Sequence, residues 1–170
     1  MSGARLFGLA GWSGSGKTTL VTRLLPELTR RGLAVSTVKH AHHAFDVDQP
    51  GKDSWRHREA GATEVMISSA QRWALMHEHR GAPEATLAEL VRHMSAVDLI
   101  LVEGFKAEPH PKLEVHRPAL GKPLLCRDDM HIVAVASDAR LADVAVPVLP
   151  LDDAAAIARF ILAHFRLEAA

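Results

Sequence analysis

The sequence predicts an α/β protein with a three-layer fold, a mostly parallel central sheet and some antiparallel edge strands. Two observations support this prediction. Residues 11–18 read GWSGSGKT and fit the pattern G-x-x-x-x-G-K-[ST], which is typical of a phosphate-binding P-loop. The motif lies between a short apolar run at residues 6–10 and a stretch at residues 18–31 in which Leu and Val repeat at helical spacing. This order of strand, loop and helix predicts the P-loop NTPase fold.

The residue types of the loop match what phosphate binding requires. A backbone that wraps around phosphate oxygens needs glycine where a Cβ atom would clash or where φ must be positive. The loop amides and the positive end of the following helix then face the phosphate charge. We expect Lys17 to reach the β- and γ-phosphates and the Thr18 hydroxyl to bind Mg²⁺. The nucleotide-binding residues predicted within the motif are Gly11, Ser13, Gly14, Ser15, Gly16, Lys17 and Thr18.

Length and composition predict one soluble domain over residues 1–170. Twenty basic and twenty acidic side chains cancel, so the overall charge favours neither nucleic acid nor an anionic membrane as a partner. A single cysteine cannot form an internal disulfide, and no apolar run has transmembrane length. The N-terminus lacks a signal-peptide pattern. We therefore expect a cytoplasmic protein.

Residues 34–39 form a second β-rich segment, so the first part of the chain reads as a right-handed βαβ unit. Ligands of such sheets lie beyond the C-terminal ends of the strands, where Lys39 and His40 emerge. The polar loop 40–52 that follows is long for a compact domain, and long loops are often functional. Its histidines, His40, His42 and His43, form either a metal site or a solvated, phosphate-facing loop.

Asp53 opens a short charged helical segment, residues 53–61. Two roles remain open for it: a helix N-cap, or a carboxylate that binds Mg²⁺ or orders its waters. Residues 64–68 and 72–78 then read as two short strands that form a hairpin or an antiparallel edge.

A second informative stretch, residues 97–104, reads VDLILVEG. Four consecutive apolar residues predict a central strand, and Glu103 lies at its C-terminal end, as in a Walker B strand. A carboxylate there can hold the water shell of magnesium or orient an attacking water beside the γ-phosphate. Asp98 starts the same strand, so we expect it at the opposite edge of the sheet.

Two later strands carry further candidates. Residues 112–117 alternate apolar and charged side chains, which predicts a half-exposed strand whose polar face holds a substrate or whose edge pairs with another subunit. Residues 132–136 predict a buried strand that ends near Asp138. Asp138 either accepts hydrogen bonds from guanine N1 and N2 or caps a turn.

The P-loop, the His-rich loop that continues to residues 46–54 (DVDQPGKDS), the strand end 102–106 (VEGFK) and residues 112–117 (KLEVHR) together resemble the molybdopterin-guanine dinucleotide biosynthesis protein B (MobB) family. The resemblance covers nearly the whole chain. It implies a cytoplasmic, dimeric GTP-binding protein with weak GTPase activity. Its partner in that family is MobA, the nucleotidyltransferase that attaches GMP to molybdopterin. The usual Asn-Lys-x-Asp guanine signature is absent here, because Ala136-Ser137-Asp138 keeps only its last carboxylate.

The resemblance adds Thr19 to the phosphate contacts and supports Thr18, Asp53 and Glu103 as the magnesium side of the site. The mechanism expected from it is slow attack of water on the γ-phosphate of Mg·GTP, with Glu103 or Asp53 orienting the water and Lys17 neutralising charge. A cationic pocket for molybdopterin would consist of Lys39, His42, His43, Lys106 and Arg117, and dimerisation would use the edge at residues 112–117. The alternatives are an ATP-dependent ligase or kinase of the dethiobiotin synthetase type and an adapter that uses nucleotide only to hold a conformation.

Overall fold

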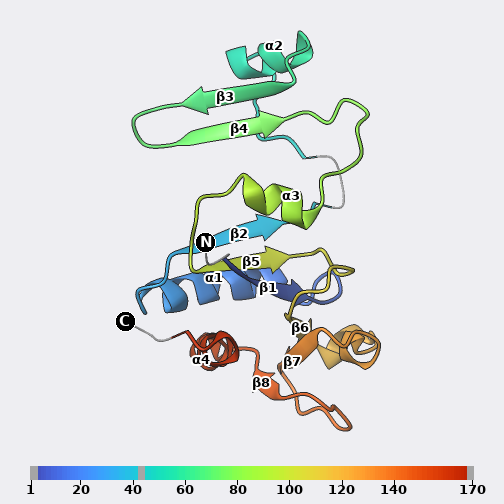
Figure 1. The fold of residues 1–170 in the computed structure, drawn as a ribbon. Helices are drawn as coiled ribbons and strands as arrows, with labels where there is room; N and C mark the ends of the chain where they lie inside the picture. The colour runs from blue at the N-terminus through green and yellow to red at the C-terminus, as the bar shows by residue number, and fades with distance from the viewer. Residues whose placement is uncertain (1–3, 42–44, 168–170) are drawn as a thin grey trace. The chain divides into compact units, whose positions relative to one another are not determined.

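The computed structural model describes residues 4–41 and 45–167. The chain divides into two compact units, one made of residues 1–40 and 94–170 and the other of residues 41–93. The larger unit contains the P-loop and a six-stranded sheet in the order β2-β5-β1-β6-β7-β8 (Figure 1). The strands are β1 (Arg5–Ala10), β2 (Val35–Lys39), β5 (Leu99–Glu103), β6 (Lys112–His116), β7 (Ile132–Ser137) and β8 (Val148–Pro150).

All neighbouring strands of this sheet are parallel. Their C-terminal ends therefore lie at one edge, which brings together segments that are far apart in the sequence. The P-loop follows β1, Lys39 ends β2, Glu103 ends β5, Arg117 follows β6 and Asp138 follows β7. The predicted α/β class with a mostly parallel sheet is confirmed, although the antiparallel strands belong to a separate small sheet.

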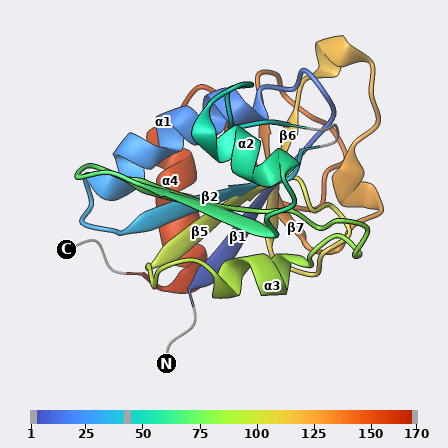
Figure 2. The ribbon, with the colours of Figure 1, turned by 90° about the horizontal axis from the view of Figure 1, so that it is seen from above.

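Two helices cover one face of the sheet, α1 (Lys17–Thr29) and α4 (Ala154–Phe165), and they lie side by side (Figure 2). In α1, Leu20, Leu24 and Leu28 recur at four-residue spacing, so they share one face and are buried. They pack in one core cluster with Phe7 and Leu9 of β1. This core holds the start of α1 against the end of β1, which fixes both ends of the P-loop.

The smaller unit contains α2 (Asp53–Glu59), the strands β3 (Glu64–Ser68) and β4 (Trp73–His77), and α3 (Leu87–Arg92). The two strands pair antiparallel, as the sequence predicts. The helix α3 begins with a capping box in which Thr86 and Glu89 bond each other's backbone N–H groups. Among the described residues 45–93, Val65 and Leu87 are the only buried hydrophobic side chains. This unit therefore has very little apolar core of its own.

The strand β6 corrects one prediction. It is not a half-exposed edge strand, because it lies between β1 and β7 and all five of its residues are buried. Its charged side chains are buried because each has a partner. The Lys112 ammonium donates to Asp129 at 2.8 Å, the Glu114 carboxylate accepts from two backbone N–H groups, and His116 lies 3.7 Å from Glu114. The predicted dimer edge at residues 112–117 is therefore wrong.

Across the described ranges, no helix combines the length and the apolar character needed to cross a membrane.

Two short 3₁₀ turns, η1 (Pro118–Leu120) and η2 (Leu125–Arg127), complete the larger unit. They follow β6 directly and belong to the surroundings of the P-loop described below.

Candidate functional site

The P-loop has the backbone conformation that its glycines predict. Gly11, Gly14 and Gly16 have φ values of 145°, 79° and 101°. A Cβ atom on Gly11 would also lie 2.5 Å from the Val115 carbonyl oxygen, so no other residue fits there. Ser15 is buried, and its hydroxyl has no hydrogen-bond partner within the described part of the chain. Ser13, Gly14, Thr18 and Thr19 are exposed and accessible to a ligand.

Lys17, the first residue of α1, reaches back across the loop. Its ammonium donates hydrogen bonds to the carbonyl oxygens of Gly11 and Trp12, both at 3.0 Å. Burial lowers the pKa of Lys17, the nearby Glu103 carboxylate raises it, and the charges of Lys106 and Lys39 lower it further. The first turn of α1 contains no acidic residue, so its positive end is not neutralised by the helix itself. This end of the sheet therefore attracts anions.

The Walker A and Walker B residues meet directly. The Thr18 hydroxyl donates to Glu103 Oε1 at 2.8 Å, and the Lys39 ammonium lies 3.7 Å from the same oxygen. The other acidic residue of this strand region, Asp98, lies at the opposite end, where it accepts the backbone N–H of Ala34. The sequence assigned the two acids to opposite edges, and the structure confirms this placement.

The turn after Glu103 is held in an uncommon conformation. Gly104 has φ 96° and Phe105 has φ 49°, so two successive residues lie in the left-handed region. A Cβ atom on Gly104 would lie 2.7 Å from the Cβ atom of His40, whose ring lies 4.9 Å from that of Phe105. Close packing of the two strand ends therefore explains the glycine, and the turn directs Lys106 toward the P-loop.

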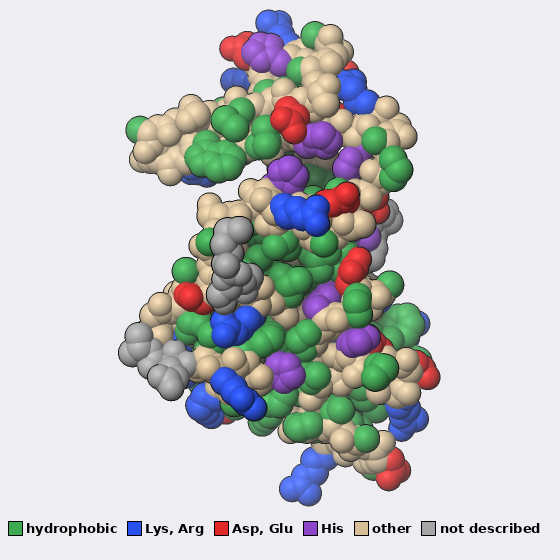
Figure 3. All heavy atoms as spheres, viewed as in Figure 1, with side chains coloured by type: hydrophobic (Ala, Val, Ile, Leu, Met, Phe, Trp, Pro, Cys, Tyr) green, Lys and Arg blue, Asp and Glu red, His purple; other side chains and the backbone are tan. Residues whose placement is uncertain are grey.

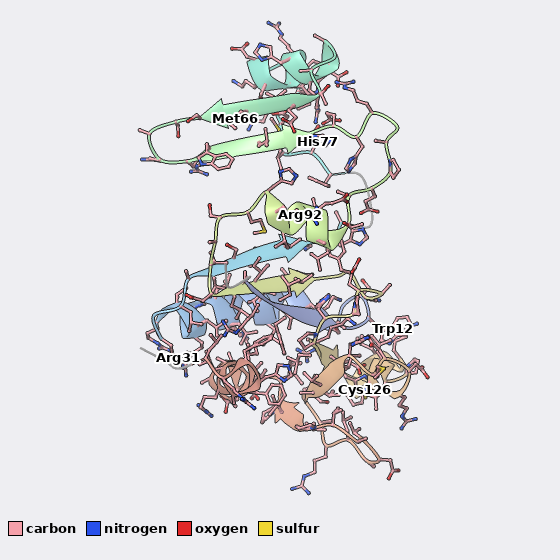
Figure 4. The ribbon with its side chains drawn as sticks, in the orientation of Figure 1. Trp12, Arg31, Met66, His77, Arg92 and Cys126 are labelled. Carbon is pink, nitrogen blue, oxygen red and sulfur yellow. The ribbon has the colours of Figure 1, made fainter. Side chains whose placement is uncertain are left out.

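The segment that follows β6 holds Trp12 of the P-loop. Trp12 and Cys126, which belongs to this segment, lie on the same side of the molecule in Figure 4. The indole N–H of Trp12 donates to the carbonyl oxygen of Pro123 at 2.9 Å. The ammonium groups of Lys106 and Lys122 lie 5.3 Å and 5.6 Å from the centre of its ring, within the range of cation–π attraction. Glu114 fixes the far end of this segment, because its carboxylate accepts the N–H groups of Leu125 and Cys126, both at 2.9 Å.

Arg117 lies between the P-loop and Asp138 and contacts both. Its Nε donates to the Ser15 carbonyl oxygen at 3.0 Å, and its Nη1 donates to Asp138 Oδ2 at 2.5 Å. Both residues line a pocket of about 560 Å³ beside the ends of β7 and β8. The other lining residues of the pocket include Arg23, Arg140 and Asp152.

The remaining predicted residues are placed as follows. Asp53 is the first residue of α2 and belongs to the smaller unit. The N-cap of that helix is Lys52, so the capping role that the sequence left open for Asp53 is not seen. His42 and His43 lie outside the described residues. Within the described ranges, no three His, Cys, Asp or Glu side chains gather as they would around a metal ion.

The sequence did not predict the roles of three residues around the loop, Arg23, Lys122 and Pro123. Residues 118–124 contain no recognisable motif, and Pro123 acts through its backbone carbonyl, which any residue type carries. Arg23 is one charged residue on the exposed side of a helix, where charges are common. Only the folded chain shows that Lys122 and Pro123 contact Trp12 of the P-loop and that Arg23 lines the pocket beside β7 and β8.

Comparisons with known proteins agree on one family. The sequence model described as "MobB: Molybdopterin guanine dinucleotide synthesis protein B" matches residues 6–138. The "Molybdopterin-guanine dinucleotide biosynthesis adapter protein" of Escherichia coli strain K12 is 44% identical over 160 residues, which cover 92% of this chain and 91% of that protein. The protein of the same name from Haemophilus influenzae is 45% identical over 136 residues, covering 78% and 74% of the two chains.

Solved structures support the same assignment. A crystal structure of molybdopterin-guanine biosynthesis protein B (mobB) superposes with a TM-score of 0.75 at 30% identity, covering 94% of this chain and 99% of that one. Bacillus subtilis MobB superposes with a TM-score of 0.72 at 24% identity and covers 94% and 96%, which supports the fold alone. The described site, the family match and these relatives lead to one conclusion: the chain belongs to the MobB family.

Proposed function

We propose that this chain binds Mg·GTP at its P-loop and acts as an adapter in the biosynthesis of molybdopterin guanine dinucleotide. The observation that supports nucleotide binding is the hydrogen bond between Thr18 and Glu103, beside Lys17 and the positive end of α1. The pathway comes from the relatives, which are named adapter proteins of this biosynthesis. These comparisons do not favour the ATP-dependent ligase or kinase alternative.

The donor atoms at the strand end fit magnesium. Mg²⁺ prefers oxygen ligands and keeps several waters, so it needs few protein groups. The Thr18 hydroxyl and the Glu103 carboxylate, 2.8 Å apart, are such groups. When bound, the ion would neutralise charge on the β- and γ-phosphates. In this chain Lys17 and the loop amides would bind the phosphates, and Glu103 would orient a water molecule.

We expect GTP hydrolysis to be slow. P-loop GTPases that lack an arginine supplied to the transferred phosphate turn over well below about one per second. Slow turnover suits an adapter, since hydrolysis can time release from a partner. The proposed partner is the guanylyltransferase MobA, and the proposed location is the cytoplasm. For molybdopterin we propose a cationic site that includes Lys39 and Lys106, whose charges already act on Lys17.

Base recognition is proposed for the pocket beside β7 and β8. Asp138 lines it and carries a carboxylate that can accept the N1 and N2 hydrogens of guanine, which adenine does not offer in that arrangement. The pocket is of a size that suits a ligand group and borders the P-loop through Arg117. These features support GTP over ATP.

We also propose that the chain forms a homodimer. The interface would be the β3–β4 hairpin, because β6, the edge predicted from the sequence, is buried within the sheet. Met66 and Leu75 form a cross-strand pair and share a face with Trp73. We call these three residues the hairpin patch; their exposed fractions are 62%, 39% and 60%. Figure 3 shows hydrophobic side chains at the surface of the hairpin. Of the four exposed large hydrophobic side chains of the hairpin, only Ile67 lies on the other face. Exposed apolar residues that share a sheet face mark an interaction surface, and a second copy offers the same apolar face.

The proposal is tested by reconstituting guanine dinucleotide synthesis with purified MobA, molybdopterin and limiting GTP. Adding this chain should raise the rate of product formation, and the Lys17→Ala variant should not. An equal rate with the intact chain, the variant and no added protein would refute the adapter function.

A further inference from the structure

Arg117 makes two contacts that its sequence position does not suggest. Its guanidinium spans from the P-loop, at the Ser15 carbonyl oxygen, to the carboxylate of Asp138. The third nitrogen, Nη2, lies 3.6 Å from where a Cβ atom on Gly16 would be. The side chain therefore lies along the outer side of the phosphate-binding loop, with one end in the pocket beside β7 and β8.

The support beneath Arg117 is rigid. It directly follows β6, a central strand whose five residues are all buried. Glu114 of that strand anchors the segment after Arg117 through the N–H groups of Leu125 and Cys126. The same segment holds Trp12 at the start of the loop. The P-loop is thus braced at both Trp12 and Ser15 by one fixed stretch of chain.

The geometry points to Arg117 as a positioning residue that couples the base side of the nucleotide site to its phosphate side. This inference rests on the proposed function, since it takes the pocket at Asp138 as the base side. Only one oxygen of the Asp138 carboxylate, Oδ2, bonds Arg117 at 2.5 Å, so the ion pair and a bond from the base to the other oxygen are compatible. Arg117 holds Ser15 and Asp138 in one arrangement, and a base bound at Asp138 therefore stabilises the loop conformation that binds phosphate.

A lysine cannot replace the arginine in this role. The planar guanidinium presents donors in a fixed fork that reaches two acceptors at once, whereas an ammonium is a compact point charge on a flexible stem. A role in charge alone would survive the change of Arg117 to lysine, and a positioning role would not. This difference separates the inference from a simple electrostatic contribution to phosphate binding.

The test uses inorganic tripolyphosphate, which has the phosphates of the nucleotide and no base. Calorimetry would measure its binding with Mg²⁺ to the full chain and to the Arg117→Lys, Asp138→Ala and double variants. The matched control is Arg159→Lys, the same substitution on the exposed side of α4. Circular dichroism and thermal unfolding would establish that each variant is folded.

We expect Arg117→Lys to weaken tripolyphosphate binding about tenfold, the loss typical of a charged hydrogen bond. Asp138→Ala should also weaken it severalfold, although tripolyphosphate has no base to contact Asp138. In the Arg117→Lys background the Asp138 change should have no further effect, because the coupling is already lost.

Unchanged tripolyphosphate affinity in both single variants would overturn the inference, and so would additive losses in the double variant. If Arg117→Lys fails to fold, the effect of Asp138→Ala on tripolyphosphate binding tests the inference by itself. We expect that variant to fold, because the Asp138 side chain is half-exposed. Failure of the proposed function is distinguishable, because it would appear as Mg·ATP binding as tight as or tighter than Mg·GTP in the unaltered chain, whatever the variants do to tripolyphosphate binding.

Discussion

Lys17 is the side chain on which we expect phosphate binding to depend most. Its ammonium bridges the Gly11 and Trp12 carbonyl oxygens at the surface of the loop, and these bonds place its charge over the loop without packing it in the core. We expect Lys17→Ala to weaken Mg·GTP binding by about 100-fold, from loss of charged hydrogen bonds, while the fold is kept. Calorimetric titration checks this, with Arg30→Ala at the far end of α1 as control. Full affinity in a folded Lys17 variant would contradict the site.

Gly104 shows how one backbone position sets the geometry of the Walker B end. Its φ of 96° and the 2.7 Å approach of His40 Cβ both exclude a side chain. We expect Gly104→Ala to reduce the free energy of unfolding by about 2–3 kcal/mol. The matched control is Gly121→Ala, at φ 61° with open space around it, which should cost about 1 kcal/mol. Equal effects of the two changes on denaturant unfolding would show that His40 does not restrict this turn.

His110 gives the larger unit a defined sensitivity to acid. It is buried, neither ring nitrogen has a partner among the described residues, and burial together with the Lys112 charge lowers its pKa from 6.5 to about 4. The folded state therefore binds this proton less readily than the unfolded state. The associated stability is present above about pH 6.5 and is lost as the pH falls toward about 4.

We expect this loss to be about 2 kcal/mol between about pH 7 and about pH 5. Urea unfolding across that range measures it, and in His110→Leu the pH dependence should shrink by that amount. The exposed His57→Leu serves as control. A pH dependence that is the same in His110→Leu and the unaltered chain would disprove the assignment.

Among the elements, the hairpin of β3 and β4 carries the dimer prediction. We expect Leu75→Lys, in the hairpin patch, to convert the homodimer to monomer, because an ammonium would be buried against the second copy. Ala74→Lys places the same charge on the opposite face of the same strand and should leave the dimer intact. Light scattering after size exclusion gives the mass of each. A monomeric unaltered chain, or equal effects of both changes, would rule out this interface.

The elements also show what the sequence could and could not predict. The P-loop, α1 and the Glu103 strand end were predictable because motif spacing and hydrophobic period reflect local geometry. The position of β6 was not, because alternation of charged and apolar residues is the usual pattern of an edge strand. Its burial depends on Asp129 and on the N–H groups of Leu125 and Cys126, which only the folded chain brings near. Likewise, the contact of Arg117 with Ser15 joins residues 102 positions apart.

The single domain predicted over residues 1–170 remains a prediction. The structure has two compact units, and the described residues 45–93 bury only Val65 and Leu87 as hydrophobic side chains. So small a core does not offset the conformational entropy of about fifty residues. For this reason we do not expect the smaller unit to fold independently.

Calorimetric titration with GTP and ATP, each with and without Mg²⁺, decides whether this chain is a guanine-nucleotide adapter with a magnesium-assisted P-loop site. Tighter binding of Mg·GTP than of Mg·ATP by about tenfold or more, with affinity reduced when magnesium is omitted, is the predicted result. Equal or tighter binding of ATP would rule out a guanine-nucleotide adapter and would direct attention to ATP-dependent chemistry on a small acceptor.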